Sequence, residues 1–145
     1  MALGGGTWAV PADDATDDAI GQVRVLIDRA GGELLVFDAK PRDPETTRRL
    51  VASYTDGVEA QWLEFLADCE KYRAELERET RIKKFTLAEL EEEEQSLERL
   101  QRWYATIAAR DRYKAPSTTI AARRLKQCEK ELDTYATRVY RVVNK

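Results

Sequence analysis

Hydrophobic positions recur at helical spacing through most of this chain and predict three long helices. Steps of three or four residues hold over about residues 43–80, 87–110 and 118–143. In the third helix the steps alternate strictly between four and three, which is typical of a coiled-coil seam. The predicted inward-facing positions are Val51, Tyr54, Val58, Trp62, Phe65, Cys69, Tyr72 and Leu76, then Leu87, Leu90, Leu97, Leu100, Tyr104 and Ile107, then Ala121, Leu125, Cys128, Leu132, Tyr135, Val139 and Val142.

Polar residues at the predicted helix starts support these boundaries. The second helix opens in "KFTLAEL", where Phe85 and Leu90 have the spacing of a hydrophobic staple. Short connections make consecutive helices antiparallel, so residues 43–145 are predicted to form an antiparallel three-helix bundle. The expected caps are Asp43 before Pro44, Thr86 with Glu89 as a capping box, and Ser117 or Thr118.

Residues 1–42 show a different pattern, that of a short β-α-β segment. "GGTWAVP" has the composition of a strand. An amphipathic helix then starts in "ADDATDD" and stops at Gly31-Gly32, and the apolar run "ELLVFDA" is typical of a strand covered on both faces. The predicted fold class is therefore α+β and mainly α, with the β-α-β segment and the bundle in one folded unit.

The β-α-β segment also predicts that the protein is not a monomer. Two strands make a marginal sheet, and "ELLVFDA" is too apolar for a free edge. We expect either pairing between subunits, which would give a homodimer, or cover of the strands by the helices.

Composition narrows the class of protein. Charged residues make up 35 % of the 145 residues, the net charge is −3, and the chain has no apolar run long enough to suggest a membrane helix. The start of the chain lacks the pattern of a signal peptide, so a cytoplasmic location is expected. The absence of histidine excludes Ser-His and Cys-His nucleophiles and Cys/His zinc sites, and we expect neither an enzyme nor a cofactor.

Two clusters that suggest chemistry have simpler interpretations. The run "EEEE" spreads around a helix instead of converging, which argues against a metal site. Cys69 and Cys128 fall in the predicted seams and are expected to be unreactive core residues.

The charge reverses sign along the bundle. Residues 46–100 hold 14 acidic and 9 basic side chains, whereas residues 101–145 hold 4 acidic and 11 basic ones. In a hairpin that turns near Lys114, Glu91 to Glu94 would face Arg138 and Arg141, so one role of the reversal is to help the helices pair.

A second role is anion binding at the tip of this hairpin. Residues 99–126 contain 8 basic residues and one acid, Asp111. A helix begins beside them, and its free N–H groups suit an oxyanion or a phosphate, whereas a solvated basic face is the alternative. The candidate anion-binding residues are Arg110, Arg112 and Lys114 in the loop, supported by Arg123 or Arg124.

The order of segments resembles the N-terminal region of the chromate-resistance ChrB family, described as chromate-responsive transcriptional regulators. The similarity lies in "GTWAVP", "AGGELLVFDAKP", "FLADCEKYRAELERE", "KFTLAELEEEEQSLERLQRWYATIAARD" and "CEKELDTYATRVY". Family members usually carry a strand and a helix before "GTWAVP", so the resemblance implies that the β-α-β segment is half of a ferredoxin-like unit. It assigns no catalytic residue.

Two functions follow from these observations. The resemblance implies a non-catalytic regulatory module that responds to an oxyanion such as chromate or sulfate and acts on transcription, with DNA as a further partner. The residues by themselves slightly favour the alternative, a helical protein–protein interaction or structural module without a ligand, and the resemblance favours the regulatory module.

Overall fold

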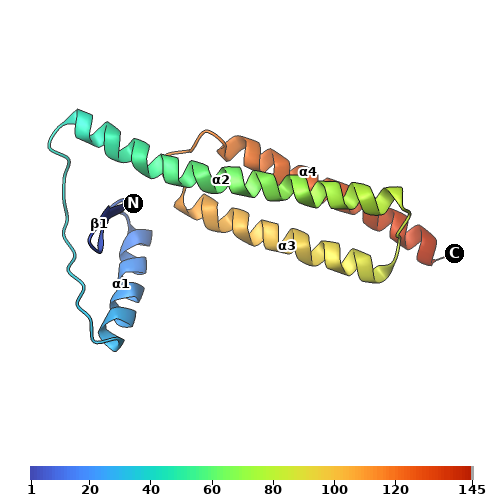
Figure 1. Cartoon of the computed structure of the whole chain (residues 1–145), viewed down its shortest axis with the longest axis horizontal. Coiled ribbons are helices and arrows are strands. Elements are labelled where there is room, and N and C mark those ends of the chain that lie inside the picture. Colours follow the sequence, from blue (N-terminus) through green and yellow to red (C-terminus); the bar gives the residue numbers. More distant parts are fainter. Residues whose placement is uncertain (145) are drawn as a thin grey trace. The chain divides into compact units, whose positions relative to one another are not determined.

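The computed structural model describes residues 1–144, which form two compact units. The first unit comprises Met1–Ser53 and the second begins at Tyr54. The chain is mainly helical, with two short strands followed by four helices (Figure 1). The elements are β1 (Ala2–Gly4), β2 (Thr7–Trp8), α1 (Asp14–Arg29), α2 (Pro44–Arg81), α3 (Leu87–Arg110) and α4 (Thr118–Val143).

The first unit contains the predicted helix and a small hairpin. β1 and β2 pair in antiparallel fashion, with Ala2 opposite Trp8. The Asp13 side chain caps α1 by accepting from the N–H of Thr16 at 2.8 Å. At its other end Gly31, at φ 73°, and Gly32 return their N–H groups to carbonyls of the last turn. The glycine stop predicted from the sequence is thus confirmed.

The predicted strand over residues 33–39 is wrong. This segment has no regular secondary structure, so the β-α-β arrangement is replaced by a β-hairpin followed by a helix. The prediction took an apolar run as a sign of burial. A strand also needs a neighbouring strand that binds its backbone N–H and C=O groups. Among the described residues, no backbone group forms a hydrogen bond with the backbone of "ELLVFDA".

The three long helices lie side by side and keep the predicted boundaries to within a residue (Figure 1). Asp43 accepts from the N–H of Thr46 at 2.7 Å in front of α2. Thr86 caps α3 by accepting from the N–H of Glu89 at 3.2 Å. The carboxylate of Glu89 binds Lys84 instead of returning to the cap residue, so half of the predicted capping box forms.

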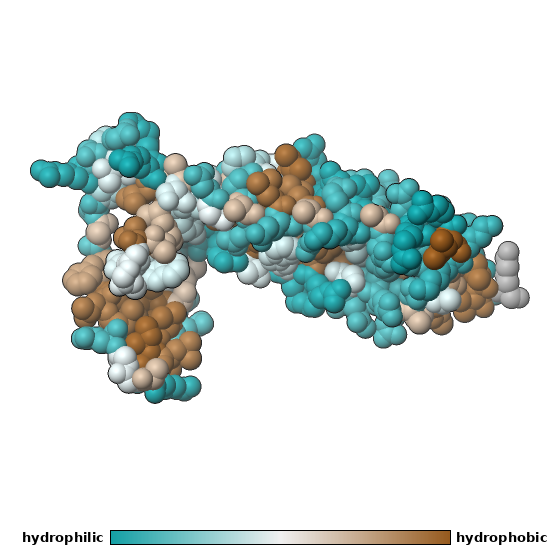
Figure 2. Space-filling model, in the orientation of Figure 1, coloured by the Kyte–Doolittle hydropathy of each residue, from teal (hydrophilic) through white to brown (hydrophobic). Residues whose placement is uncertain are grey.

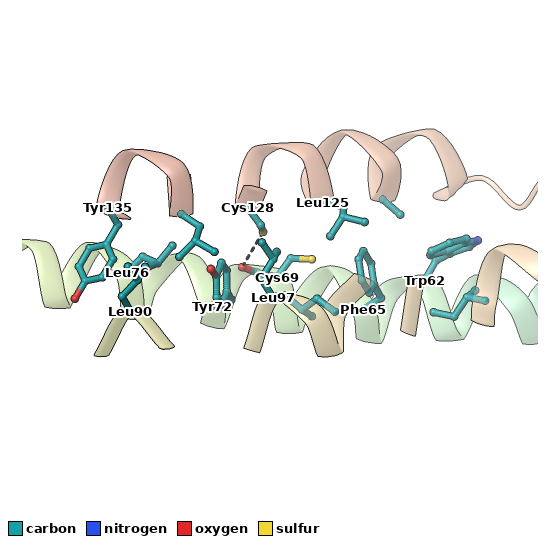
Figure 3. Packing of buried hydrophobic residues seen from close by; sticks show 14 of the residues in the cluster. Trp62, Phe65, Cys69, Tyr72, Leu76, Leu90, Leu97, Leu125, Cys128 and Tyr135 are labelled. Carbon is teal, nitrogen blue, oxygen red and sulfur yellow. Dashed lines mark hydrogen bonds between the residues drawn. The ribbon is translucent and has the colours of Figure 1, made fainter. Parts of the chain in front are cut away.

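The core of the second unit follows the predicted seams (Figure 3). Trp62, Phe65, Cys69, Tyr72 and Leu76 succeed one another along α2, and side chains of α3 and α4 pack against them. Aromatic rings fill the layers near the start of α4, where the centroids of Trp62 and Tyr104 lie 5.1 Å apart. Two predicted seam positions at helix ends, Leu87 and Val142, are exposed. The helix ends extend beyond the packed layers.

Among residues 1–144, ion pairs do not join α3 to α4 as the sequence suggested. Among the described residues, Glu91 to Glu94 form no ion pair with Arg138 or Arg141. The polar contact across this hairpin is a hydrogen bond of 2.8 Å from Gln101 to Glu129. Basic residues pair instead between α2 and α4, through Arg73 with Glu131 and Arg124 with Glu70.

Over residues 1–144, none of the helices combines the length and the apolar character needed to cross a membrane.

Candidate anion-binding site at the basic end of the bundle

The loop between α3 and α4 is anchored to α2. The hydroxyl of Tyr54 donates to the carbonyl of Arg110 at 2.8 Å. The Tyr54 ring also meets the ring of Tyr113 edge-on, with centroids 5.7 Å apart. Lys114 turns the chain in the left-handed region, at φ 55°. These contacts hold the exposed side chains of Arg110 and Lys114 on an ordered loop.

Asp111 organises the inside of this loop. Its Oδ1 accepts from the N–H of Ala115 at 2.9 Å, and its Oδ2 accepts from the Trp62 indole at 2.9 Å. The hydroxyl of Thr118 also donates to Oδ2. Burial acts to raise the pKa of Asp111, but the hydrogen bonds from Thr118, Trp62 and Ala115 outweigh it and lower the pKa. The single acid among the cations is thus a structural carboxylate.

The start of α4 already holds a carboxylate of the protein itself. Glu59 of α2 accepts from the N–H of Ser117 at 2.9 Å and from its hydroxyl at 2.6 Å. Ser117 is the N-cap residue, as predicted, but its side chain makes no capping bond to the helix. Negative charge is favoured at a helix N-terminus, and Glu59 supplies it. The N–H of Ser117 therefore already has Glu59 as its hydrogen-bond partner. Binding of an external anion at this end stays a prediction, and it depends on the basic side chains of the loop and of α4.

The five predicted cations have different surroundings. Arg110, Arg112 and Lys114 are exposed at the loop. Arg112 donates to the carbonyl of Ala109. Arg124 is half-buried and paired with Glu70, so its charge is compensated within the bundle. Arg123 is exposed and forms no ion pair with the described residues.

Sequence reasoning missed that the basic surface continues along α4. Lys126 and Lys130 follow Arg123 at steps of three and four, and Arg141 returns to the same face. All four are exposed, and none has a carboxylate within ion-pair distance among residues 1–144. Asp133 lies at the edge of this face. The helical spacing of Arg123, Lys126, Lys130 and Arg141 could have predicted this face from the sequence, but the predicted site ended at Arg124.

The opposite end of the bundle buries two acidic side chains, and the sequence did not predict their burial. Glu79 is 1 % exposed, and its Oε1 accepts from Arg78 at 2.8 Å while its Oε2 lacks a hydrogen-bond partner. Glu93 is the one residue of the "EEEE" run that is buried. Burial and the nearby carboxylates, chiefly Glu75 and Glu79, raise the pKa of Glu93 to about 7. Within residues 1–144, no group of three or more potential ligands is arranged to hold a metal ion.

Comparison with known proteins identifies the family of the chain. No curated protein and no solved structure matches the chain significantly. A family model described as "Protein ChrB, N-terminal" matches residues 1–145. Because this match covers the entire sequence, the chain belongs to the ChrB N-terminal family.

Proposed function

We propose that this chain is a non-catalytic regulatory module that binds the phosphate groups of DNA through a basic face. This basic face comprises Arg110 and Lys114 at the loop and Arg123, Lys126, Lys130 and Arg141 on α4. The observation that carries the proposal is that these exposed cations have no carboxylate partner among the described residues, although many other cations of the bundle do.

Many cations elsewhere in the bundle differ from those of the basic face because carboxylates neutralise them. Lys71 pairs with Asp68 at 2.7 Å, and Arg73 binds Glu131 at 2.8 Å. Such pairs leave little net charge at the surface. The unpaired cations of the basic face keep their full attraction for an external anion, which salt screens at distances beyond about 8–10 Å.

The layout of these cations suits a polyanion better than one small oxyanion. At about 1.5 Å per residue, Arg123 and Lys130 lie about 10 Å apart along α4, and Arg141 lies about 27 Å from Arg123. Chromate or sulfate would contact one or two of these side chains. The phosphates of a nucleic acid repeat along its backbone and can meet several of them at once.

Membership of the ChrB N-terminal family supports a regulatory role, since that resemblance implies control of transcription in response to chromate. Chromate, sulfate and the DNA backbone all present negatively charged oxygens to the same cations. The proposal commits to the DNA backbone and treats the free oxyanions as a separate arm of the test.

The test is a binding titration of fluorescent duplex DNA at several salt concentrations. We compare the native chain with a variant that carries Arg123→Ala, Lys126→Ala and Lys130→Ala. Each phosphate contact that is lost should reduce the slope of log K against log salt by about 0.9. The variant should therefore bind more weakly and show a flatter salt dependence, equally for unrelated DNA sequences.

A matched control removes three cations elsewhere, through Arg48→Ala, Lys71→Ala and Arg81→Ala, and gives the same change of net charge. Calorimetric titration with chromate and with sulfate forms the second arm. If both triple variants bind DNA like the native chain, the basic face is a solvated surface. A helical interaction module is then the better interpretation, and the exposed apolar side chains of residues 1–53 favour it.

A further inference from the structure

Residues 33–39 leave their backbone without partners. The segment follows the glycine stop of α1 and runs as an open stretch towards α2 (Figure 1). None of its backbone N–H or C=O groups forms a backbone hydrogen bond with any residue that the structure describes. Such a segment can accept a second strand on either edge, in the way that an unprotected sheet edge does.

All residues of this segment except the partly buried Leu34 are exposed. Leu35 is 67 % exposed, Val36 46 % and Phe37 80 %. No residue of the first unit is buried, and apolar residues gather on the surface of α1 and the segment after it (Figure 2). Isolated exposed apolar residues are normal at a protein surface, but a continuous apolar run with an open backbone marks an interaction site.

We propose that residues 33–40 are a homodimerisation strand, which pairs in antiparallel fashion with the same segment of a second copy. The pairing places Glu33 of one copy opposite Lys40 of the other and Val36 opposite Phe37. A two-fold axis repeats both contacts, so one strand pair contains two ion pairs and two contacts between a β-branched and an aromatic side chain.

The charges at the two ends of the segment identify a second copy as the occupant. Glu33 precedes the apolar residues 34–37, and Lys40 follows them after Asp38 and Ala39. In the reversed segment the two end charges therefore meet as opposite charges, while Asp38 lies opposite Leu35.

A parallel pair would set Glu33 beside Glu33 and Lys40 beside Lys40, which is unfavourable. A shift of one residue would place Lys40 opposite Gly32 and lose both ion pairs. Charge complementarity therefore selects the antiparallel direction. The other register with two ion pairs, Asp38 opposite Lys40, would place Pro41 opposite Phe37 and leave the start of the apolar run unpaired, so the register with Glu33 opposite Lys40 is favoured.

The apolar content of the segment favours the pairing. Val36 and Phe37 each lose part of their solvent contact where they meet across the two strands, and backbone groups of the segment gain hydrogen bonds. The interface uses no residue of the basic face. The proposal thus goes beyond DNA binding, and its test is independent of the test of DNA binding.

Charge reversal tests the pairing directly. Glu33→Lys and Lys40→Glu each place like charges opposite one another at both ends of the strand pair. We expect each single variant to raise the dimer dissociation constant at least about tenfold. The double variant Glu33→Lys/Lys40→Glu restores opposite charges and should return to within about threefold of the native value. Sedimentation equilibrium measures all four proteins.

Matched controls reverse the charge of exposed residues on α1, through Asp18→Lys and Arg24→Glu, and should leave the dimer intact. Val36→Pro removes an N–H group from the centre of the strand and should give a monomer whose helical circular dichroism is unchanged. A native chain that is a monomer at about 100 µM would overturn the proposal. The segment would then be a binding site for a strand of another protein. The proposal would also be overturned if charge reversal and Val36→Pro left the dimer dissociation constant unchanged, because the interface would then lie elsewhere.

Discussion

The carboxylate of Glu59 on α2 binds both polar groups of Ser117 at the start of α4, at 2.9 Å to the N–H and 2.6 Å to the hydroxyl. Ser117 is 6 % exposed, so water has little access to these groups. One side chain therefore satisfies a buried helix start and joins two helices that are distant in sequence. The same contact fills a position where an external oxyanion would otherwise meet the helix.

Replacement of Glu59 by alanine should destabilise the bundle. The change leaves the N–H and the hydroxyl of Ser117 without a partner in a buried place, which costs about 1–3 kcal/mol. Glu59→Gln should cost less, because its amide oxygen can still accept one hydrogen bond. Urea unfolding followed by circular dichroism measures the difference. Glu64→Ala on the exposed face of the same helix is the control, and an equal loss in both variants would show that Glu59 has no special role.

Glu93 should make the stability of the bundle fall as the pH rises. Its pKa is about 7 in the folded chain, above the usual value of a glutamate, chiefly because of burial. The folded state thus binds the proton more tightly than the unfolded state. This contribution is complete below the unfolded pKa near 4.5 and is lost as the pH passes 7.

Glu93→Gln removes that titration and should flatten the pH dependence. We expect the variant to gain on the order of 1–3 kcal/mol over the native chain at pH 8 and much less at pH 5. Denaturant unfolding at several pH values gives both curves. Glu94→Gln changes an exposed neighbour of the same charge, and it should leave the native pH dependence in place. Parallel curves for Glu93→Gln and the native chain would contradict the assignment.

The bundle could be predicted from the sequence because its signals are local. The capping residues Asp43 and Thr86 lie within three residues of the N–H groups that they bind, and the seam from Val58 to Leu76 repeats at helical spacing. Such patterns depend little on the rest of the fold. The prediction failed for "ELLVFDA" because a strand is defined by its neighbour, and hydrophobicity does not show whether a neighbour is present.

The candidate site could be predicted only in part for the same reason. The basic character of the loop follows from the count of charges, which is a property of the sequence. Which cations remain uncompensated depends on contacts between helices, such as that of Arg124 with Glu70. The occupation of the α4 start by Glu59 joins residues 58 positions apart and has no local signal.

Lys83→Gly should stabilise the turn between α2 and α3. Lys83 lies in the left-handed region at φ 58°, which is unfavourable for a residue with a Cβ atom and suits glycine. Its N–H and that of Lys84 bind carbonyls of the last turn of α2, the usual closing pattern of a helix with glycine at this position. We expect a gain of up to about 1 kcal/mol in thermal or urea unfolding. Lys83→Ala keeps the Cβ atom and should give no such gain.

Cys69 and Cys128 should be inert in the folded chain. Both side chains are fully buried, and the Cys128 thiol lies 3.9 Å from the carbonyl oxygen of Cys69 (Figure 3). The hydrogen bond with Cys128 and burial raise the pKa of the Cys69 thiol, which disfavours the reactive thiolate.

Labelling by a thiol reagent should therefore follow global unfolding of the bundle. Without denaturant we expect a rate far below that of a free thiol, and in urea the rate should rise in step with the loss of helical signal. A variant with Thr137→Cys on the exposed face of α4 supplies the matched positive control and should react at once. Rapid modification of either native cysteine, at a rate close to that of the control, would show that the α2–α4 interface opens far more readily than its packing implies.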